Sequence, residues 1–232
     1  GGPVQWAAGY ELRDEEALFQ PDGAAVLGMI YGVAADKTEG DYSVDELYAE
    51  MRLPILKDEP FADVLAAEIS VRYSDYDNMD DTSTNWKYAV EWGPISSLRF
   101  RAVFAEGFRS ANIGELFNPQ QLSAQQYNEP CLNYGSGANA TVSANCAADG
   151  LPPDFTLSSN QASSLFGGNP DLKPEESESL TVGIVIVPEI LPSLSVSLDY
   201  FNIKIINGVG TAGTNNIITG CYNSPNFSSS WC

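Results

Sequence analysis

The residue types that most often perform catalysis are missing or wrongly spaced in this chain. Histidine is absent from all 232 residues, so a Ser-His-Asp triad cannot form, and no Gly-x-Ser-x-Gly sequence occurs. A mixed Cys/His zinc site is excluded for the same reason, and the four cysteines lack the CxxC spacing of an all-thiolate zinc site. We therefore expect no enzyme, no metal centre and no cofactor.

The four cysteines form two pairs that are close in sequence, each in a stretch rich in Asn, Ser and Gly. The pairs are Cys131 with Cys146 and Cys221 with Cys232. Such spacing in loops favours local disulfide bonds made in an oxidising compartment, with free thiols as the alternative. We predict the bonds Cys131–Cys146 and Cys221–Cys232. A closed ring of ~15 residues stabilises a fold by about 3 kcal/mol in the chain-entropy estimate.

An acidic segment offers oxygen ligands of the kind that Ca²⁺ prefers. Its aspartates are Asp75, Asp77, Asp80 and Asp81. The segment has neither the glycine nor the distal glutamate of an EF-hand loop. A solvated acidic turn is therefore the favoured interpretation, and no metal site is predicted. The formal net charge of −20 argues against a nucleic-acid partner, because phosphate binding needs a basic surface.

Charged side chains also recur at alternate positions, which gives each segment one polar and one apolar side. Arg99 and Arg101, for example, alternate with Leu98, Phe100 and Ala102. Because unpaired buried charge is costly, the polar side must stay wet. A soluble sheet with one solvated face and a membrane barrel with a watery lumen both satisfy this requirement. The charged residues that could line a substrate path, or simply pair across strands, are Glu68, Arg72, Lys87, Glu91, Arg99 and Arg101.

The elements that must position these side chains are strands, because seven segments alternate with a period of two. They are Val4–Arg13, Val44–Leu53, Leu65–Tyr76, Thr84–Trp92, Leu98–Ala105, Ser179–Ile186 and Leu194–Ile205, the last with a bulge near Phe201. We expect one antiparallel meander in chain order, with Trp92 opposite Leu98 and Glu91 opposite Arg99. The outer face should carry Trp86, Tyr88, Val90, Leu98, Phe100 and Phe104.

Short and long connections alternate between these strands. The short ones are Pro54–Asp63, which breaks the pairing at Pro54 and Pro60, Gly93–Ser96 and Pro188–Ser193. The long ones are Asp14–Ser43, Phe108–Asp171 and Asn207–Cys232, with the acidic turn Asp75–Ser83 on their side. Phe108–Asp171 shows no convincing strand, only helical turns near Ile113–Phe117 and Ser158–Leu165. A soluble sandwich has no reason to gather its long loops at one end, whereas an outer-membrane barrel does.

Five stretches resemble the barrel of the TonB-dependent outer-membrane receptors. They are AEMRLPIL (Ala49–Leu56), VRYSDYD (Val71–Asp77), GFRSANIGELF (Gly107–Phe117), GNPDLKPEESESLTVGI (Gly168–Ile184) and LDYFNIKIING (Leu198–Gly208). The cysteine pairs also look like the extracellular-loop cysteines of a large proteobacterial subgroup. Phe108–Phe117 and Gly168–Glu175 are candidates for ligand contact, or for fixing the loop ends at the barrel rim.

This resemblance implies an all-β fold: an antiparallel up-and-down transmembrane β-barrel, with about seven strands of a 22-stranded barrel in this chain. Residues 1–232 are then a partial barrel domain, without the family's N-terminal plug domain, TonB box and C-terminal strands. The family's members lie in the bacterial outer membrane and contact its lipid. They bind scarce nutrients such as siderophores or oligosaccharides outside the cell, and import them with energy from TonB.

Two features of the sequence argue against haem as the nutrient. Haem receptors of the family carry FRAP and NPNL-like boxes with a histidine between them, whereas Phe108–Ala111 reads FRSA, Asn169–Leu172 reads NPDL and no histidine exists. We therefore expect a nutrient other than haem. The alternative function is a passive porin-like barrel or a structural, adhesive one, and an outer-membrane enzyme is the least favoured class.

Overall fold

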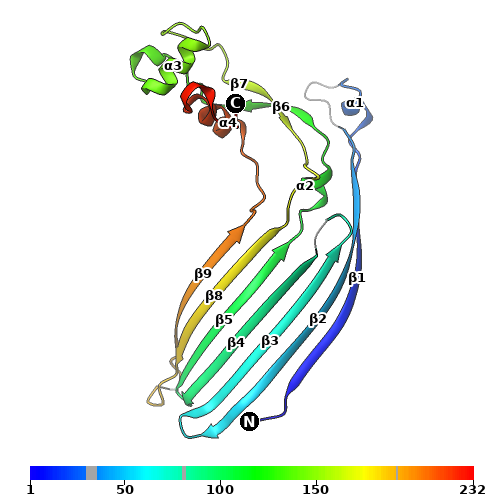
Figure 1. The fold of residues 1–232 in the computed structure, drawn as a ribbon, viewed down its shortest axis with the longest axis vertical. Coiled ribbons are helices and arrows are strands. Elements are labelled where there is room, and N and C mark those ends of the chain that lie inside the picture. The colour runs from blue at the N-terminus through cyan, green and yellow to red at the C-terminus, as the bar shows by residue number, and fades with distance from the viewer. Residues whose placement is uncertain (30–35, 80–81, 192) are drawn as a thin grey trace. The chain divides into compact units, whose positions relative to one another are not determined.

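The computed structural model describes residues 1–29, 36–79, 82–191 and 193–232 (Figure 1). The chain divides into two compact units, which are described separately. The first, here called the sheet unit, comprises Gly1–Leu18, Glu39–Leu116 and Pro170–Val209. The second, the loop unit, comprises Phe19–Thr38, Phe117–Asn169 and Gly210–Cys232. In the described part of the chain, no helix is both long and apolar enough to cross a membrane.

Seven antiparallel strands form one sheet in the order in which they occur along the chain, and Figure 1 shows them side by side. The expected meander is therefore confirmed. The strands are β1 (Gln5–Phe19), β2 (Thr38–Glu59), β3 (Ala62–Tyr76), β4 (Ser83–Ile95), β5 (Leu98–Arg109), β8 (Glu175–Ile186) and β9 (Val196–Ile206). Strands β1 and β2 extend well into the segment expected to be a long loop, where the short helix α1 (Gly23–Val26) also lies.

The expected break at Pro54 is wrong. Strand β2 continues through Pro54 to Glu59, which pairs with Ala62 of β3. The pairing shifts between Pro54 and Leu56, as at a bulge, which accommodates the hydrogen bond that proline cannot donate. The connection is thus the two residues Pro60 and Phe61, and Phe61 has the positive φ of 62° that such a tight turn uses.

The register expected for β4 and β5 is wrong by two residues. Trp92 pairs with Phe100 rather than Leu98, and Glu91 pairs with Arg101 rather than Arg99. The strand does not stop at Gly93: it continues to Ile95, which pairs with Leu98, and the ladder shifts between Trp92 and Ile95. Because side chains alternate with a period of two, a two-residue error leaves every residue on its expected face.

No bulge interrupts β9, contrary to expectation. Its pairing with β8 runs without a shift from Val196 opposite Ile186 to Ile206 opposite Glu176. Along β9 the apolar residues therefore switch from one face of the sheet to the other, and no extra residue is inserted. Phe201, Ile203 and Ile205 lie on the side of the sheet that also carries Asp199. The turn between the two strands was expected at Pro188–Ser193, and its Pro192 lies outside the described residues.

The loop unit contains a hairpin that the sequence did not reveal. Strand β6 (Gln121–Gln126) pairs with β7 (Gln161–Phe166), where a strandless loop and a helical turn were expected. Their Gln- and Ser-rich sequences hide the apolar alternation that marks the other strands. The expected helical turn at Ile113–Phe117 is present as α2, in the sheet unit. The loop unit also holds α3 (Ala140–Ala148), α4 (Thr214–Tyr222) and the 3-10 turns η1 (Tyr134–Ser136) and η2 (Pro225–Phe227).

Two disulfide bonds organise the loop unit. Cys131 is bonded to Cys146 of α3, and both are fully buried beside Tyr134 and Val142. Cys221 of α4 is bonded to Cys232. The small core of this unit is therefore built around a covalent link rather than around a large apolar cluster. This is the usual solution where too few apolar residues are available.

Candidate functional site

The two faces of the sheet differ sharply in chemistry. Cross-strand pairs such as Tyr88 with Phe104 and Trp92 with Phe100 lie on one side, here called the apolar face. Tyr88, Val90 and Trp92 on this face are 45%, 49% and 41% exposed. A contiguous surface of exposed aromatic and aliphatic side chains needs an apolar medium or partner against it.

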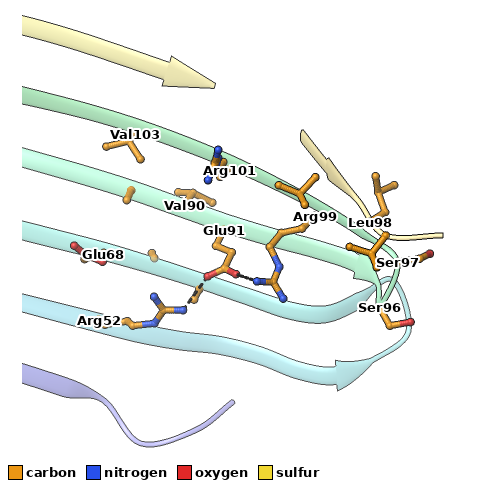
Figure 2. A pocket seen from close by; sticks show the side chains of 15 residues that line it. Arg52, Glu68, Val90, Glu91, Ser96, Ser97, Leu98, Arg99, Arg101 and Val103 are labelled. Atoms are coloured by element: carbon orange, nitrogen blue, oxygen red, sulfur yellow. Dashed lines mark hydrogen bonds and ion pairs between the residues drawn. The ribbon is translucent and has the colours of Figure 1, made fainter. Parts of the chain in front are cut away.

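The opposite side, here called the polar face, holds all six charged residues singled out in the sequence. Each of them is paired with an opposite charge, and four of them form two mutual pairs across neighbouring strands. Lys87 Nζ on β4 lies 2.6 Å from Glu68 Oε1 on β3. Glu91 lies between two arginines: its Oε2 is 2.9 Å from Arg52 Nη2, and its Oε1 is 3.0 Å from Arg99 Nη1 (Figure 2).

Arg101 reaches across a whole strand to form its ion pair. Its Nη2 donates to both carboxylate oxygens of Asp199 at 2.8 Å, and its Nε donates to Oδ1 at 3.0 Å. Strand β8 lies between the two residues, and Gly183 is the residue opposite both. A Cβ atom at Gly183 would stand 1.9 Å from Asp199 Oδ1. The glycine therefore makes room for a bidentate pair that links β5 to β9.

A second network lies on β2 and β3. Glu46, which is only 4% exposed, accepts hydrogen bonds from Arg72 Nη1 at 2.9 Å and from Ser74 Oγ at 2.5 Å. Arg13 Nη1 lies 3.9 Å from the same carboxylate. Arg72 also stands over the ring of Tyr48, with Cζ 5.3 Å from its centroid, a favourable cation–π geometry.

The sequence did not single out four members of these networks. Three of them, Glu46, Arg52 and Asp199, pair with predicted residues, and the fourth, Arg13, lies near Glu46. Each lies on the polar face of its strand. The period-2 alternation of the sequence therefore indicated their face, although not their partners. Naming them as partners requires the register, because only the pairing of strands says which charges meet.

Small side chains leave a hollow of about 450 Å³ on the polar face, beside the Glu91 ion pairs (Figure 2). Ala66, Ala89 and Val103 form part of its wall, and Arg52, Glu91 and Arg99 another part. Glu91 is paired with both Arg52 and Arg99, so these three side chains carry one net positive charge, which the single carboxylate only partly compensates. The hollow therefore combines small apolar side chains with a weakly cationic ion-pair network.

A further charged cluster joins the ends of β5, β8 and β9. Arg109 Nε lies 2.5 Å from Glu175 Oε2, and Arg109 Nη1 lies 2.9 Å from Glu115 Oε2. The backbone N–H of Val209 donates to Glu175. Asn112 and Glu115 cap α2 reciprocally, each side chain accepting from the other's backbone N–H. The hydrogen bond from Arg109, and then that from the Asn112 amide, lower the pKa of Glu115.

These contacts involve two stretches considered as ligand contacts. Arg109, Asn112 and Glu115 belong to Phe108–Phe117, and Glu175 ends Gly168–Glu175. Their charged side chains bond to one another and hold the strand ends together. The geometry thus matches the alternative that these stretches fix the ends of the loops.

A protein-family model matches almost the full length of the chain. The model is described as TonB dependent receptor-like, beta-barrel, and it covers residues 1–230. The chain belongs to the TonB-dependent receptor family. No curated protein matches the chain.

The crystal structure of the siderophore receptor PirA from Acinetobacter baumannii is similar to this TonB-dependent receptor chain in fold. The TM-score is 0.56 and the sequence identity 16%, over 88% of this chain and 24% of PirA. The chain thus spans about a quarter of the length of that receptor. At this identity the likeness shows the fold alone. It supports a β-barrel fold to which this chain contributes seven strands.

Family membership places the chain in the bacterial outer membrane. A barrel there turns its apolar side chains to lipid and its polar side chains to the lumen, which accounts for the two faces of the sheet. The family's members are transport receptors rather than enzymes. The chain is therefore part of an outer-membrane receptor barrel with disulfide-bonded loops.

The acidic segment of this receptor chain is partly engaged in local bonds. Asp77 accepts from the backbone N–H of Ser43 at 2.9 Å and from its hydroxyl at 2.8 Å, which ties the segment to β2. Asp80 and Asp81 lie outside the described residues. Among residues 1–29, 36–79, 82–191 and 193–232, no group of three or more His, Cys, Asp or Glu is placed to hold a metal ion.

Proposed function

We propose that this chain is part of a receptor that captures a scarce nutrient outside the cell and imports it with energy supplied through TonB. The observation that carries the proposal is a sheet with one apolar and one polar face, in a chain that matches the family's barrel. The strand ends bound by Arg109 lead into the long segments that form the loop unit. Long loops are the usual place for ligand capture in such barrels.

The polar face then lines the transport path. Glu68, Arg72, Lys87, Glu91, Arg99 and Arg101 are proposed as lumen-lining residues. Their mutual ion pairs, with Arg52, Glu46 and Asp199 as partners, make this wall hydrophilic and nearly neutral. Such a wall allows a polar ligand to pass without trapping it, because the charges of these named residues are already paired with one another.

The experiment is uptake by cells that produce the full-length receptor, with and without a functional TonB. The probes are a radiolabelled ferric trishydroxamate and radiolabelled maltohexaose. We expect accumulation of one of the two probes only when TonB is functional. A passive barrel would admit small solutes equally in both strains, and equal accumulation would overturn the proposal in favour of the porin-like alternative.

The nutrient is proposed to be something other than haem. Haem iron usually takes a His, Cys, Met or Tyr ligand, and the chain has no histidine. The cysteines are bonded. Among the tyrosines of the loop after β5, Tyr134 is buried and donates to the carbonyl of Leu151, and Tyr127 donates to Glu129. Both hydroxyl groups are thus already engaged within the loop unit.

Titration of the full-length receptor with haem, followed by the Soret band, tests this prediction. We expect no saturable shift that depends on the loop between Arg109 and Glu175. A tight, saturable Soret change that disappears when this loop is deleted would show that the substrate class is haem after all.

A further inference from the structure

Trp231 of the loop unit is an exposed aromatic side chain held in a fixed position. Its indole lies against Gly220 of α4: a Cβ atom there would stand 2.5 Å from Trp231 Cε3 and 2.9 Å from Cζ3. The adjoining residues, Cys221 and Cys232, are bonded to each other. The disulfide thus clamps the ring against the bare glycine backbone, yet the residue remains 49% exposed.

The segment around Trp231 is also tied down by hydrogen bonds. Ser224 Oγ donates to the carbonyl of Cys221 at 2.7 Å and accepts from the backbone N–H of Ser229 at 3.1 Å. The backbone N–H of Trp231 donates to Ser229 Oγ at 3.2 Å. The carbonyl of Ser224 accepts from Asn145 of α3, whose side chain is almost fully buried. The indole is therefore preorganised, which lowers the entropy cost of binding a ligand.

The charge of these two loop segments argues against their binding an anionic ligand. The sequence has no lysine or arginine from Ser110 to Leu172, nor from Asn207 to Cys232, although both segments are long. The acidic residues Glu129, Asp149 and Asp154 belong to the loop unit. An anionic ligand would find only repulsive charges on these segments, since tight anion binding uses Arg, Lys or a metal ion.

Uncharged polar residues, in contrast, are abundant in the sequence around Trp231. Asn226, Ser228 and Ser230 flank it in sequence and are exposed. Amides and hydroxyl groups donate and accept hydrogen bonds without charge. An indole adds a flat apolar surface with a single N–H donor. A sugar ring matches this combination, because it has an apolar face of C–H groups and a rim of hydroxyl groups.

We propose that Trp231, clamped on Gly220 by the Cys221–Cys232 bond, is a stacking platform for an uncharged sugar ring. This inference rests on the proposed function, and it makes the nutrient a neutral oligosaccharide. The neighbouring amide and hydroxyl groups orient the ring through hydrogen bonds. Because both loop segments lack basic residues, the platform binds uncharged ligands in preference to anionic ones.

The test measures binding of neutral and anionic oligosaccharides to the full-length receptor in detergent, by calorimetry. The neutral probes are maltohexaose, cellohexaose and xylohexaose, and the anionic probe is a galacturonic acid oligomer. We expect saturable binding of at least one neutral probe and none of the anionic one. Trp231→Ala should weaken that binding about tenfold, Trp231→Phe should weaken it less, and Gly220→Ala should weaken it by displacing the ring.

The matched control is Leu132→Ala, which removes another exposed side chain of the loop unit and should leave binding unchanged. A non-reducing peptide map verifies the Cys221–Cys232 bond in every variant. If no neutral probe binds, or if Trp231→Ala binds as well as the unaltered receptor, the platform is refuted. TonB-dependent import of the ferric trishydroxamate would then leave the proposed function standing, whereas loss of all TonB dependence would overturn both.

Discussion

Gly183 shows how a single residue can determine an ion pair to which it contributes no side chain. The Arg101–Asp199 pair passes directly over it, and its missing Cβ is what allows the approach. Glycine ordinarily weakens a strand, because it has no side chain to pack and loses more conformational freedom on folding. Its presence at the centre of β8 is therefore explained by the two charged groups above it.

We predict that Gly183→Ala destabilises the receptor, although alanine is the better residue for an ordinary strand position. The new Cβ would displace the Asp199 carboxylate and break the bidentate pair, at a cost of about 1 kcal/mol, since both side chains are partly exposed. The measurement is the thermal unfolding midpoint of the full-length receptor in detergent. In an Asp199→Ala background the same substitution should be harmless. Equal destabilisation in both backgrounds would disprove the explanation.

At the scale of elements, the cap of α2 holds the end of β5 to the beginning of β8. Asn112 and Glu115 bond reciprocally, and Arg109 joins Glu115 to Glu175. A helix of only five residues cannot be stable by its own propensity. Its caps and its two buried residues, Ile113 and Leu116, must therefore keep it folded.

We predict that Asn112→Ala increases hydrogen exchange of the α2 amides about fivefold, as expected for loss of a cap of ~1 kcal/mol. Glu115→Gln should have a smaller effect, because the amide oxygen still accepts from the Asn112 N–H. Mass spectrometry of the full-length receptor measures both. If exchange in α2 is the same in Asn112→Ala as in the unaltered receptor, the cap does not hold the helix.

The pH dependence of this element follows from the lowered pKa of Glu115. A carboxylate whose pKa is lower in the folded state contributes stability above its unfolded pKa of ~4.3 and loses it as the pH falls through the folded value. Hydrogen exchange of α2, corrected for its intrinsic pH dependence, should therefore increase below about pH 4. Glu115→Gln should show no such step, and a step of equal size in that variant would contradict the assignment.

At the scale of the whole molecule, two segments far apart in sequence fold together as the loop unit. Asn145 of α3 donates from Nδ2 to the carbonyls of Tyr222 and Ser224, at 2.9 and 2.8 Å. Tyr222 donates to Asp149, and burial followed by this hydrogen bond raises the pKa of Tyr222. The loop after β5 and the segment after β9 are thus one structural body.

We predict that Asn145→Asp separates these two segments. The substitution keeps the shape but removes both donors and places a carboxylate beside two carbonyl oxygens, at a cost of about 2–3 kcal/mol. Limited proteolysis of the full-length receptor should then cut near α4 much faster. Asn226→Asp, at an exposed position of the same unit, is the control. Identical proteolysis of Asn145→Asp and the control would show that Asn145 does not join the segments.

The disulfide bonds of the loop unit can be checked independently. A non-reducing peptide map of the purified receptor should yield Cys131 linked to Cys146 and Cys221 linked to Cys232. Cys131 linked to Cys221, or four free thiols, would contradict the structure.

Except in the second half of β9, the sequence by itself determined which residues share a face of the sheet, and it also determined the order in which the seven strands pair. Period-2 alternation is a local property of the extended backbone, so Lys87, Glu91 and Arg101 were placed together before any pairing was known. The regular alternation of short and long connections between these strands then indicated an outer-membrane barrel. The pairing of the nearest cysteines follows equally from short separations along the chain. These features depend on residues close together in sequence, which is why they could be read directly.

Only the tertiary structure decided which charges meet. The register of β4 and β5 depends on where the ladder shifts, near Pro94, and it places Arg101 rather than Arg99 directly opposite Glu91, although Arg99 still forms an ion pair with Glu91. The Arg101–Asp199 pair requires β5, β8 and β9 in one register, with Gly183 between them. The β6–β7 hairpin and the contacts of Asn145 join distant segments. Such contacts depend on long-range packing, for which a local pattern contains no signal.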